Sequence, residues 1–164
     1  TWLFRLRKSW TLPTTMADLT PSRSLILDGV LWQAVLAHLQ ACLPNEGVGL
    51  LSTVDTHDDF RALRFYPGRN LNESPSRFTM DPLDVLRACE DMEREGTRLG
   101  VVVHSHPTTA PEPSPTDVRE LAMPGVVNLI VQLRPRVCAR AWEITPAGSV
   151  ELPIRAEAPA PGEG

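Results

Sequence analysis

Residues 101–117 read Val-Val-Val-His-Ser-His-Pro-Thr-Thr-Ala-Pro-Glu-Pro-Ser-Pro-Thr-Asp and carry the clearest structural signal in the chain. The three β-branched valines at the start predict a strand over residues 99–104. Because side chains two apart in a strand point to the same face, His104 and His106 are expected to present both imidazoles on one side. Pro107 ends the strand, since it has no backbone N–H to donate. Two converging imidazoles make half of a metal site.

The second half of this stretch predicts a third ligand. Prolines at positions 111, 113 and 115 keep the chain out of regular structure and stiffen it. Ser114 then begins a short helix as its N-cap, with proline at the first helical position and Asp117 at the third. Two histidines and a carboxylate leave a fourth tetrahedral position for water, as in catalytic rather than structural zinc sites. The sequence therefore indicates one Zn²⁺ per chain, held by His104, His106 and Asp117.

Each half of the pattern also has an interpretation without a metal. A His-X-His pair at a strand end is often a polar rim of a sheet, and Ser-Pro-Thr-Asp by itself is an ordinary helix cap. Both patterns lie within fourteen residues of the chain. This proximity favours a metal site over two unrelated surface features.

The same residues resemble the complete signature of the JAMM metalloprotease family, also called MPN-plus. The signature is the run HSHP at 104–107, followed after six residues by Ser114 and after two more by Asp117. The resemblance implies zinc bound by the two histidines and the aspartate. It also implies cleavage of peptide or isopeptide bonds after the C-terminus of ubiquitin or ubiquitin-like proteins. It covers about residues 25–154, and the compact size resembles small prokaryotic members that process sulfur-carrier proteins.

The family also needs a glutamate just before a strand of small and apolar residues. Residues 44–51, PNEGVGLL, are similar to that segment and depart from it at Val48, where many relatives carry cysteine. The resemblance implies that Glu46 is the general base and that Ser114 donates a hydrogen bond to the oxyanion. Without the resemblance, Glu46 is one of several upstream glutamates and is typical of a surface turn. Ser114 likewise stays open between a capping and a catalytic role.

The hydrophobic pattern outside this stretch predicts the fold class, α/β. Strands are expected at 24–27, 48–54, 60–66, 126–133, 137–144 and 150–154, in addition to 99–104. A first helix follows Asp28 as N-cap and ends before Pro44, and a second runs from Asp81 to Gly96. With a short third helix over 114–123, these elements predict a mixed β-sheet flanked by two main helices. The resemblance implies that the sheet is curved, in a JAMM/MPN, cytidine-deaminase-like fold.

Helical periodicity also predicts which residues of the two main helices face the core. On the first they are Leu31, Ala34, Val35, Leu39 and Cys42. On the second, Leu83, Leu86, Cys89 or Glu90, and 92–95 trace an amphipathic pattern with an acidic outer face, on which Glu90, Asp91, Glu93 and Glu95 are expected to be solvated. Residues 67–77 are expected to form a polar loop, and such loops often lie beside binding sites. The family resemblance places this loop near the site, which makes Asn70 a candidate contact to substrate or to a site residue.

Length and composition limit the possible classes of protein. The 164 residues suggest one domain, expected over 21–155, with 1–20 as a disordered extension and 156–164 as a flexible tail. A net charge of −4 without a basic stripe argues against a nucleic-acid partner. Three cysteines without a Cys-X-X-Cys pair indicate a reduced, cytoplasmic compartment, and each is expected in the core. No apolar run approaches the roughly 20 residues of a membrane helix.

Together these features predict a zinc-dependent hydrolase that acts on a ubiquitin-like or sulfur-carrier protein. The substrate is expected as an extended C-terminal tail lying along a sheet edge. Whether the bond is a peptide or a lysine isopeptide stays open, as does the oligomeric state. A non-catalytic MPN-type scaffold that binds a protein partner is an alternative, but relatives of that kind usually lack ligands that are present here. A nucleoside deaminase is a third, against which the absent Pro-Cys-X-X-Cys ligands argue.

Overall fold

A computed structural model describes residues 23–55 and 59–157. The predicted extension over 1–20, and residues 158–164 of the predicted tail, lie outside these ranges. The expected domain boundaries therefore stay predictions. The described ranges include the whole of 101–117 and the segment around Glu46.

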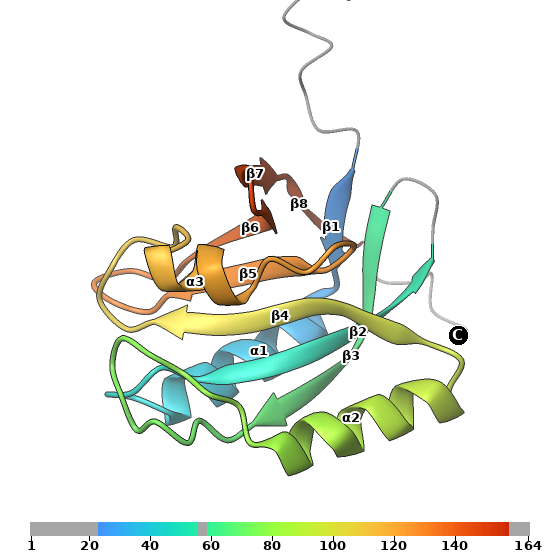
Figure 1. Cartoon of the computed structure of the whole chain (residues 1–164), viewed down its shortest axis with the longest axis horizontal. Coiled ribbons are helices and arrows are strands. Elements are labelled where there is room, and N and C mark those ends of the chain that lie inside the picture. Colours follow the sequence, from blue (N-terminus) through green and yellow to red (C-terminus); the bar gives the residue numbers. More distant parts are fainter. Residues whose placement is uncertain (1–22, 56–58, 158–164) are drawn as a thin grey trace, which may run out of the picture.

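An eight-stranded mixed sheet forms the centre of the fold (Figure 1). Its strands are β1 (Ser24–Leu27), β2 (Val48–Asp55), β3 (Asp59–Gly68), β4 (Arg98–His106), β5 (Val127–Gln132), β6 (Cys138–Thr145), β7 (Gly148–Leu152) and β8 (Ile154–Ala156). Their order across the sheet is β7-β6-β5-β4-β2-β3-β1-β8. β4 pairs in parallel with β5, and β1 pairs in parallel with β3 and β8, while the remaining neighbours are antiparallel. The predicted mixed sheet is confirmed.

Helices cover both faces of the sheet. They are α1 (Gly29–Ala41), α2 (Pro82–Arg94) and α3 (Pro115–Glu120). In Figure 1, α1 lies behind the sheet, and α2 and α3 lie in front of it. Asp28, Asp81 and Ser114 are the N-caps, as the sequence predicted, and each side chain accepts a hydrogen bond from a backbone N–H of the first turn. No helix of the described residues is long and apolar enough to cross a membrane.

The alternation of side chains along β4 decides which face of the sheet carries the candidate site. Val101 and Val103 are buried in the core cluster on the α1 side. Val102 is buried in the cluster on the α2 side. His104 and His106 continue the series of Val102 at steps of two, so both lie on the face that α2 and α3 cover. The predicted convergence of the two imidazoles on one face is thus built into the strand.

The last two strands join opposite edges of the sheet. β7 pairs with β6 at one edge and β8 pairs with β1 at the other, although only Pro153 separates them. The Pro153 carbonyl accepts a hydrogen bond from the N–H of Leu25 at 2.9 Å. The prediction of one edge strand over 150–154 is wrong. Proline cannot donate to a ladder, so the strand divides there, and the sheet curves enough for one segment to reach both edges.

Parts of the predicted helix faces are also wrong. Ala34 is exposed on α1. On α2, Leu83 and Leu86 are 59% and 54% exposed, whereas Ala88 and Met92 are buried against the sheet. Apolar residues occupy more than one side of α2, and periodicity alone does not say which stripe the sheet will contact. The small residue at 88 lets the helix approach closely along the stripe that also holds Met92.

The three cysteines are free thiols. Cys42 is partly buried, but Cys89 and Cys138 are exposed, so the prediction of a core position is wrong for these two. Cys89 lies on the exposed face of α2, and Cys138 is the first residue of β6, at the rim of the sheet.

Candidate metal centre

Two elements bring the three predicted ligands together at one end of the sheet. The end of β4 supplies His104 and His106, and the first turn of α3 supplies Asp117. His104 Nε2 lies 3.5 Å from Asp117 Oδ1, and His106 Nε2 lies 3.6 Å from Asp117 Oδ2. One ligand atom from each residue lies within 4.8 Å of the other two, and all three residues are buried. The three side chains form a candidate metal site.

The chemistry of His104 fits a metal. Its side chain is fully buried, and neither ring nitrogen has a hydrogen-bond partner among the described residues. Leaving polar atoms buried without partners is costly, and a cation beside Nε2 would remove part of that cost. Burial lowers the pKa of His104, so its imidazole stays neutral, which is the form that binds metals. Phe78 packs on this ring, with centroids 4.9 Å apart, and keeps water from it.

His106 is oriented by the proline-rich loop that follows it. Its Nδ1 lies 2.7 Å from the carbonyl oxygen of Ala110. A carbonyl only accepts, so Nδ1 carries a hydrogen and Nε2, on the side of Asp117, is the nitrogen that can hold either a metal or a second proton. Burial lowers the pKa of His106, but Asp117 and the Ala110 carbonyl raise it more, so the net shift is upward. In the metal-free protein His106 is therefore a proton-binding partner of the carboxylate.

Asp117 is fixed by the cap of α3. The backbone N–H of Ser114 donates to Asp117 Oδ2 at 2.7 Å, and the N–H of Asp117 donates to Ser114 Oγ at 3.1 Å. This capping box holds the carboxylate plane and leaves Oδ1 facing His104. Burial raises the pKa of Asp117, but the two imidazoles and Ser114 lower it by more. The net shift is downward, so the carboxylate is ionised.

The same cap clarifies the two roles considered for Ser114. In the capping box the Ser114 oxygen accepts a hydrogen bond, and its own hydroxyl hydrogen is not used by the cap. A hydroxyl both accepts and donates, so capping and donation to a substrate are compatible. Ser114 also lines a cleft of about 240 Å³ together with Glu46 and Asp117.

The pairing of β2 with β4 places Glu46 beside the histidines. Val48 pairs with His104 in this antiparallel ladder, and the N–H of Ser105 donates to the Gly47 carbonyl at 3.0 Å. In return the buried Ser105 hydroxyl accepts a hydrogen bond from the N–H of Gly47 at 2.8 Å. Continuing the ladder by one residue puts Glu46 opposite His106. The side chains of directly opposite residues share a face, so Glu46 points to the metal side.

Burial makes the Glu46 carboxyl suitable for proton transfer near neutral pH. The residue is 5% exposed. Burial raises the pKa of Glu46 to about 7, with His106 acting to lower it and Asp117 acting to raise it. A carboxyl with a pKa near 7 both takes and releases a proton readily at neutral pH.

Comparison with known proteins agrees with this geometry. Residues 29–145 match the family model described as prokaryotic homologs of the JAB domain. The chain belongs to this family. The match confirms the resemblance to the JAMM family that the motif at 104–117 predicted.

Three curated relatives of this JAB domain have names that state an activity. A probable TtuB-protein conjugate cleaving protease of Thermus thermophilus is 39% identical over 85 residues, which cover 51% of this chain and 54% of that protein. The CysO-cysteine peptidase of Mycobacterium tuberculosis is 29% identical over 132 residues, 79% of this chain and 89% of that protein. A desampylase of Pyrococcus furiosus is 38% identical over 63 residues, 38% of this chain and 45% of that protein. The matched region therefore spans about half of the first and third relatives and most of the second.

Solved structures share the fold of this JAB domain. The solution structure of a protein from Desulfitobacterium hafniense superposes with a TM-score of 0.76 at 33% identity, covering 84% of this chain and 95% of that one. A solution structure from Salinibacter ruber gives a TM-score of 0.59 at 27% identity, covering 85% and 95% of the two chains. The predicted α/β fold is confirmed.

Asn70 connects the Glu46 segment of the JAB domain to the wall of the cleft. Its side-chain amide donates to the carbonyls of Glu46 at 3.0 Å and Arg77 at 2.9 Å. Its side-chain oxygen accepts from the N–H groups of Asn72 and Thr79, each at 3.0 Å. The sequence proposed Asn70 as a contact to substrate or to a site residue, and the structure shows a contact to the main chain of Glu46. Arg77, Thr79 and the intervening Phe78 line the cleft.

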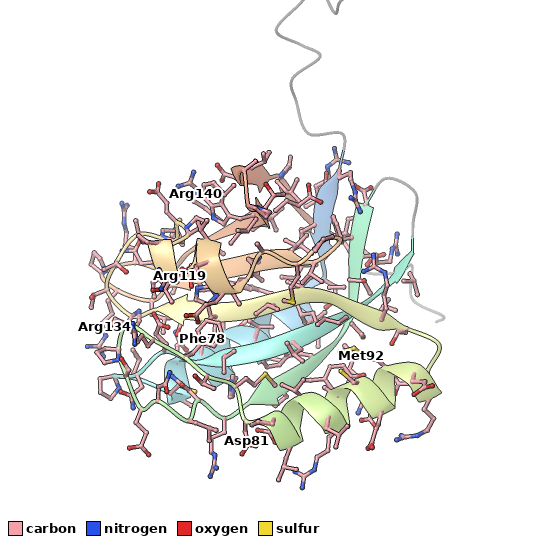
Figure 2. The ribbon with its side chains drawn as sticks, in the orientation of Figure 1. Phe78, Asp81, Met92, Arg119, Arg134 and Arg140 are labelled. Atoms are coloured by element: carbon pink, nitrogen blue, oxygen red, sulfur yellow. The ribbon has the colours of Figure 1, made fainter. Side chains whose placement is uncertain are left out.

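The sequence did not indicate the residues that fix the segments around the site without lining it. Ser105 lies between the two histidines and points to the other face, where it holds Gly47. Trp142, on β6, donates from Nε1 to the carbonyl of Pro111 at 2.9 Å. Neither role leaves a local signal, because the partners are distant in sequence. Figure 2 shows Phe78 and Arg119 on opposite sides of the end of β4, where the cleft and α3 meet.

We expect Ser105→Ala to lower the free energy of unfolding by about 1 to 3 kcal/mol, because the buried N–H of Gly47 loses its partner. Urea denaturation measures the change. Ser24→Ala is the matched control, since Ser24 is also buried but its hydroxyl has no partner among the described residues. Its stability should change by less than about 0.5 kcal/mol. Equal effects of the two substitutions would contradict the role given to Ser105.

Proposed function

We propose that the chain is a zinc-dependent peptidase that cleaves peptide or isopeptide bonds after the C-terminus of a ubiquitin-like or sulfur-carrier protein. The observation that carries this proposal is the buried group of His104, His106 and Asp117, whose ligand atoms lie within 4.8 Å of one another. Asp117 lines one cleft together with the buried Glu46. The names of the relatives, a probable TtuB-protein conjugate cleaving protease, a CysO-cysteine peptidase and a desampylase, support the substrate class. The free cysteines support a cytoplasmic location.

Three protein ligands, rather than four, favour a catalytic site. One Zn²⁺ per chain would be held by His104, His106 and Asp117. Zinc bound there would supply Lewis-acid chemistry, lowering the pKa of a bound water and polarising a carbonyl oxygen. Both effects assist hydrolysis of an amide at neutral pH.

Proton transfer is assigned to Glu46. As general base it takes a proton from the attacking water, and the water oxygen forms a bond to the scissile carbonyl carbon. As general acid it then returns the proton to the leaving amine when the C–N bond breaks. The residue is confined by the Gly47–Ser105 hydrogen bonds and by Asn70, so its carboxyl needs little reorganisation.

Ser114 is assigned to the developing oxyanion. Its hydroxyl hydrogen is free of the capping box and borders the same cleft as Glu46. A well-placed donor of this kind contributes about 2.7 to 4 kcal/mol to transition-state stabilisation.

The cleft also indicates how a substrate tail would lie. It runs between the segment of Ser76 to Thr79 and the first turns of α3. This position is beside the end of the central strand β4, and not along the edge strands β7 or β8. We therefore propose that an extended C-terminal tail lies against the 76–79 segment. An MPN-type scaffold remains the second candidate, and the complete set of ligands with a buried glutamate argues for the enzyme.

Cleavage of a defined fusion tests the proposed function. A ubiquitin-like carrier is joined through its C-terminal glycine to a reporter peptide, and to a lysine side chain in a second substrate. The native, zinc-loaded protein should cleave at least one of them after the glycine, with the bond located by mass spectrometry. Glu46→Gln should lower kcat at least about 100-fold while zinc content is kept.

Glu73→Gln is the matched control for this test, because Glu73 is an exposed glutamate of the loop that does not line the cleft. It should cleave at the native rate. A zinc-loaded native protein that cleaves neither fusion would support the scaffold instead.

Substitution of Ser114 by glycine separates its two roles. Glycine at an N-cap costs only a few tenths of a kcal/mol relative to serine, so the unfolding midpoint should hardly change. The lost donor should lower kcat about 100- to 1,000-fold with little change in KM. Ser114→Thr keeps a hydroxyl and should retain much of the rate. A glycine variant with native kcat would limit Ser114 to capping.

A further inference from the structure

The loop between β4 and α3, residues 107–113, is held by side chains in addition to two backbone hydrogen bonds, from Glu112 N–H to the Ala110 carbonyl and from Arg134 N–H to the Pro107 carbonyl. Prolines at 107, 111 and 113 have no N–H to donate. The carbonyl of Ala110 accepts from His106 Nδ1 at 2.7 Å. The next carbonyl, that of Pro111, accepts from Trp142 Nε1 at 2.9 Å, in a buried hydrogen bond. Two consecutive peptide units are thus fixed, one to a candidate metal ligand and the next to a tryptophan.

Trp142 also packs against the helix that supplies the third ligand. Its side chain is 9% exposed and belongs to a small cluster with Ile130 and Ile144. The partly buried Val118 of α3 and Leu121, the C-cap of this helix, pack on this cluster. Val118 directly follows Asp117. The indole therefore bonds the loop that orients His106 and belongs to the cluster against which the helix of Asp117 packs.

Arg140 adds a further attachment on the outer side of this indole. Its guanidinium lies 4.5 Å from the centre of the Trp142 ring. It donates to Glu112 at 2.6 Å and to both carboxylate oxygens of Glu151 at 2.9 and 2.7 Å. Glu112 is the residue after Pro111, so the guanidinium connects the loop to β6 and β7. Figure 2 shows Arg140 on the side of the molecule where these two strands lie.

We infer that Trp142 is a positioning residue for the metal site, acting on His106 through the Ala110–Pro111 peptide, with Arg140 holding the indole in place. The inference rests on the metal site of the proposed function. Metal-binding histidines usually donate the hydrogen of their other nitrogen to an acceptor, which orients the ring, and loss of such an outer contact typically lowers metal affinity about 10- to 100-fold. Without the indole N–H, the Pro111 carbonyl loses its partner, and the neighbouring Ala110 carbonyl, which also accepts from the N–H of Glu112 at 2.8 Å, is less firmly directed at His106.

Trp142→Phe tests the inference, since it keeps an aromatic ring in the cluster and removes only the N–H donor with part of the ring. Zinc affinity, measured by competition with a chelator, should fall about 10- to 100-fold. Trp32→Phe is the matched control, because Trp32 is a partly buried tryptophan on α1, across the sheet. Its zinc affinity should equal that of the native protein. Native affinity in Trp142→Phe would overturn the inference.

A double substitution separates an effect on His106 from a general effect on packing. If Trp142 acts through His106, then Trp142→Phe added to His106→Ala should cause no further loss of zinc affinity. The same fold loss in both backgrounds would show that Trp142 acts only by packing against α3, and would overturn the inference.

A measurement on the metal-free protein keeps this test independent of zinc. The Nδ1 hydrogen of His106, seen by NMR, should be protected from exchange in the native protein and should exchange at least about ten times faster in Trp142→Phe. Equal exchange rates would overturn the inference. A native protein that shows this difference but binds no zinc would instead refute the proposed function and leave the positioning contact established.

Discussion

The antiparallel register between β2 and β4 is the constraint on which the candidate site depends. It pairs Val48 with His104 and Gly47 with Ser105, and so places Glu46 opposite His106. A shift by one residue would move Glu46 to the face covered by α1. Ser105 fixes this register at its end, because its hydroxyl and its N–H both bind Gly47. The residue between two ligands thus secures the position of the proposed base.

The remaining parts of the site are fixed by groups that have a second structural task. Asp117 closes the capping box of α3 with Oδ2, which also lies near His106, and faces His104 with Oδ1. Ser114 accepts a hydrogen bond in the same box, which is compatible with the donor role proposed for it. The loop that joins these residues to β4 contains prolines, which lowers the entropy lost when it is ordered. Among the described histidines, only His104 has both ring nitrogens buried without a hydrogen-bond partner, and a bound cation would offset part of the free-energy cost of that burial.

Much of the fold could be read from local patterns, and its non-local features could not. The N-caps at Asp28, Asp81 and Ser114 were predictable, because a cap and its N–H partner lie within three residues. The division of the last strand at Pro153 and the outward leucines of α2 depend on which distant surfaces meet, which no short window contains.

The candidate site shows the same limit. The histidine pair and Asp117 have a spacing with a mechanical meaning, so the sequence identified them. Glu46 could be identified only through the family resemblance, because its position follows from the pairing of two strands. In that pairing Gly47 bonds to Ser105, 58 positions further along the chain. The hydrogen bond from Trp142 to Pro111 joins residues 31 positions apart, and the sequence did not predict it.

Zinc content per chain tests the central claim most directly. After metal-replete expression and dialysis, elemental analysis should find about one zinc per chain in the native protein, the occupancy of a single site with three protein ligands. The variant His104→Ala, which removes the buried imidazole without partners, should retain little zinc while its fold is kept, as monitored by circular dichroism. Native protein without zinc, or unchanged zinc in the His104 variant, would contradict the account.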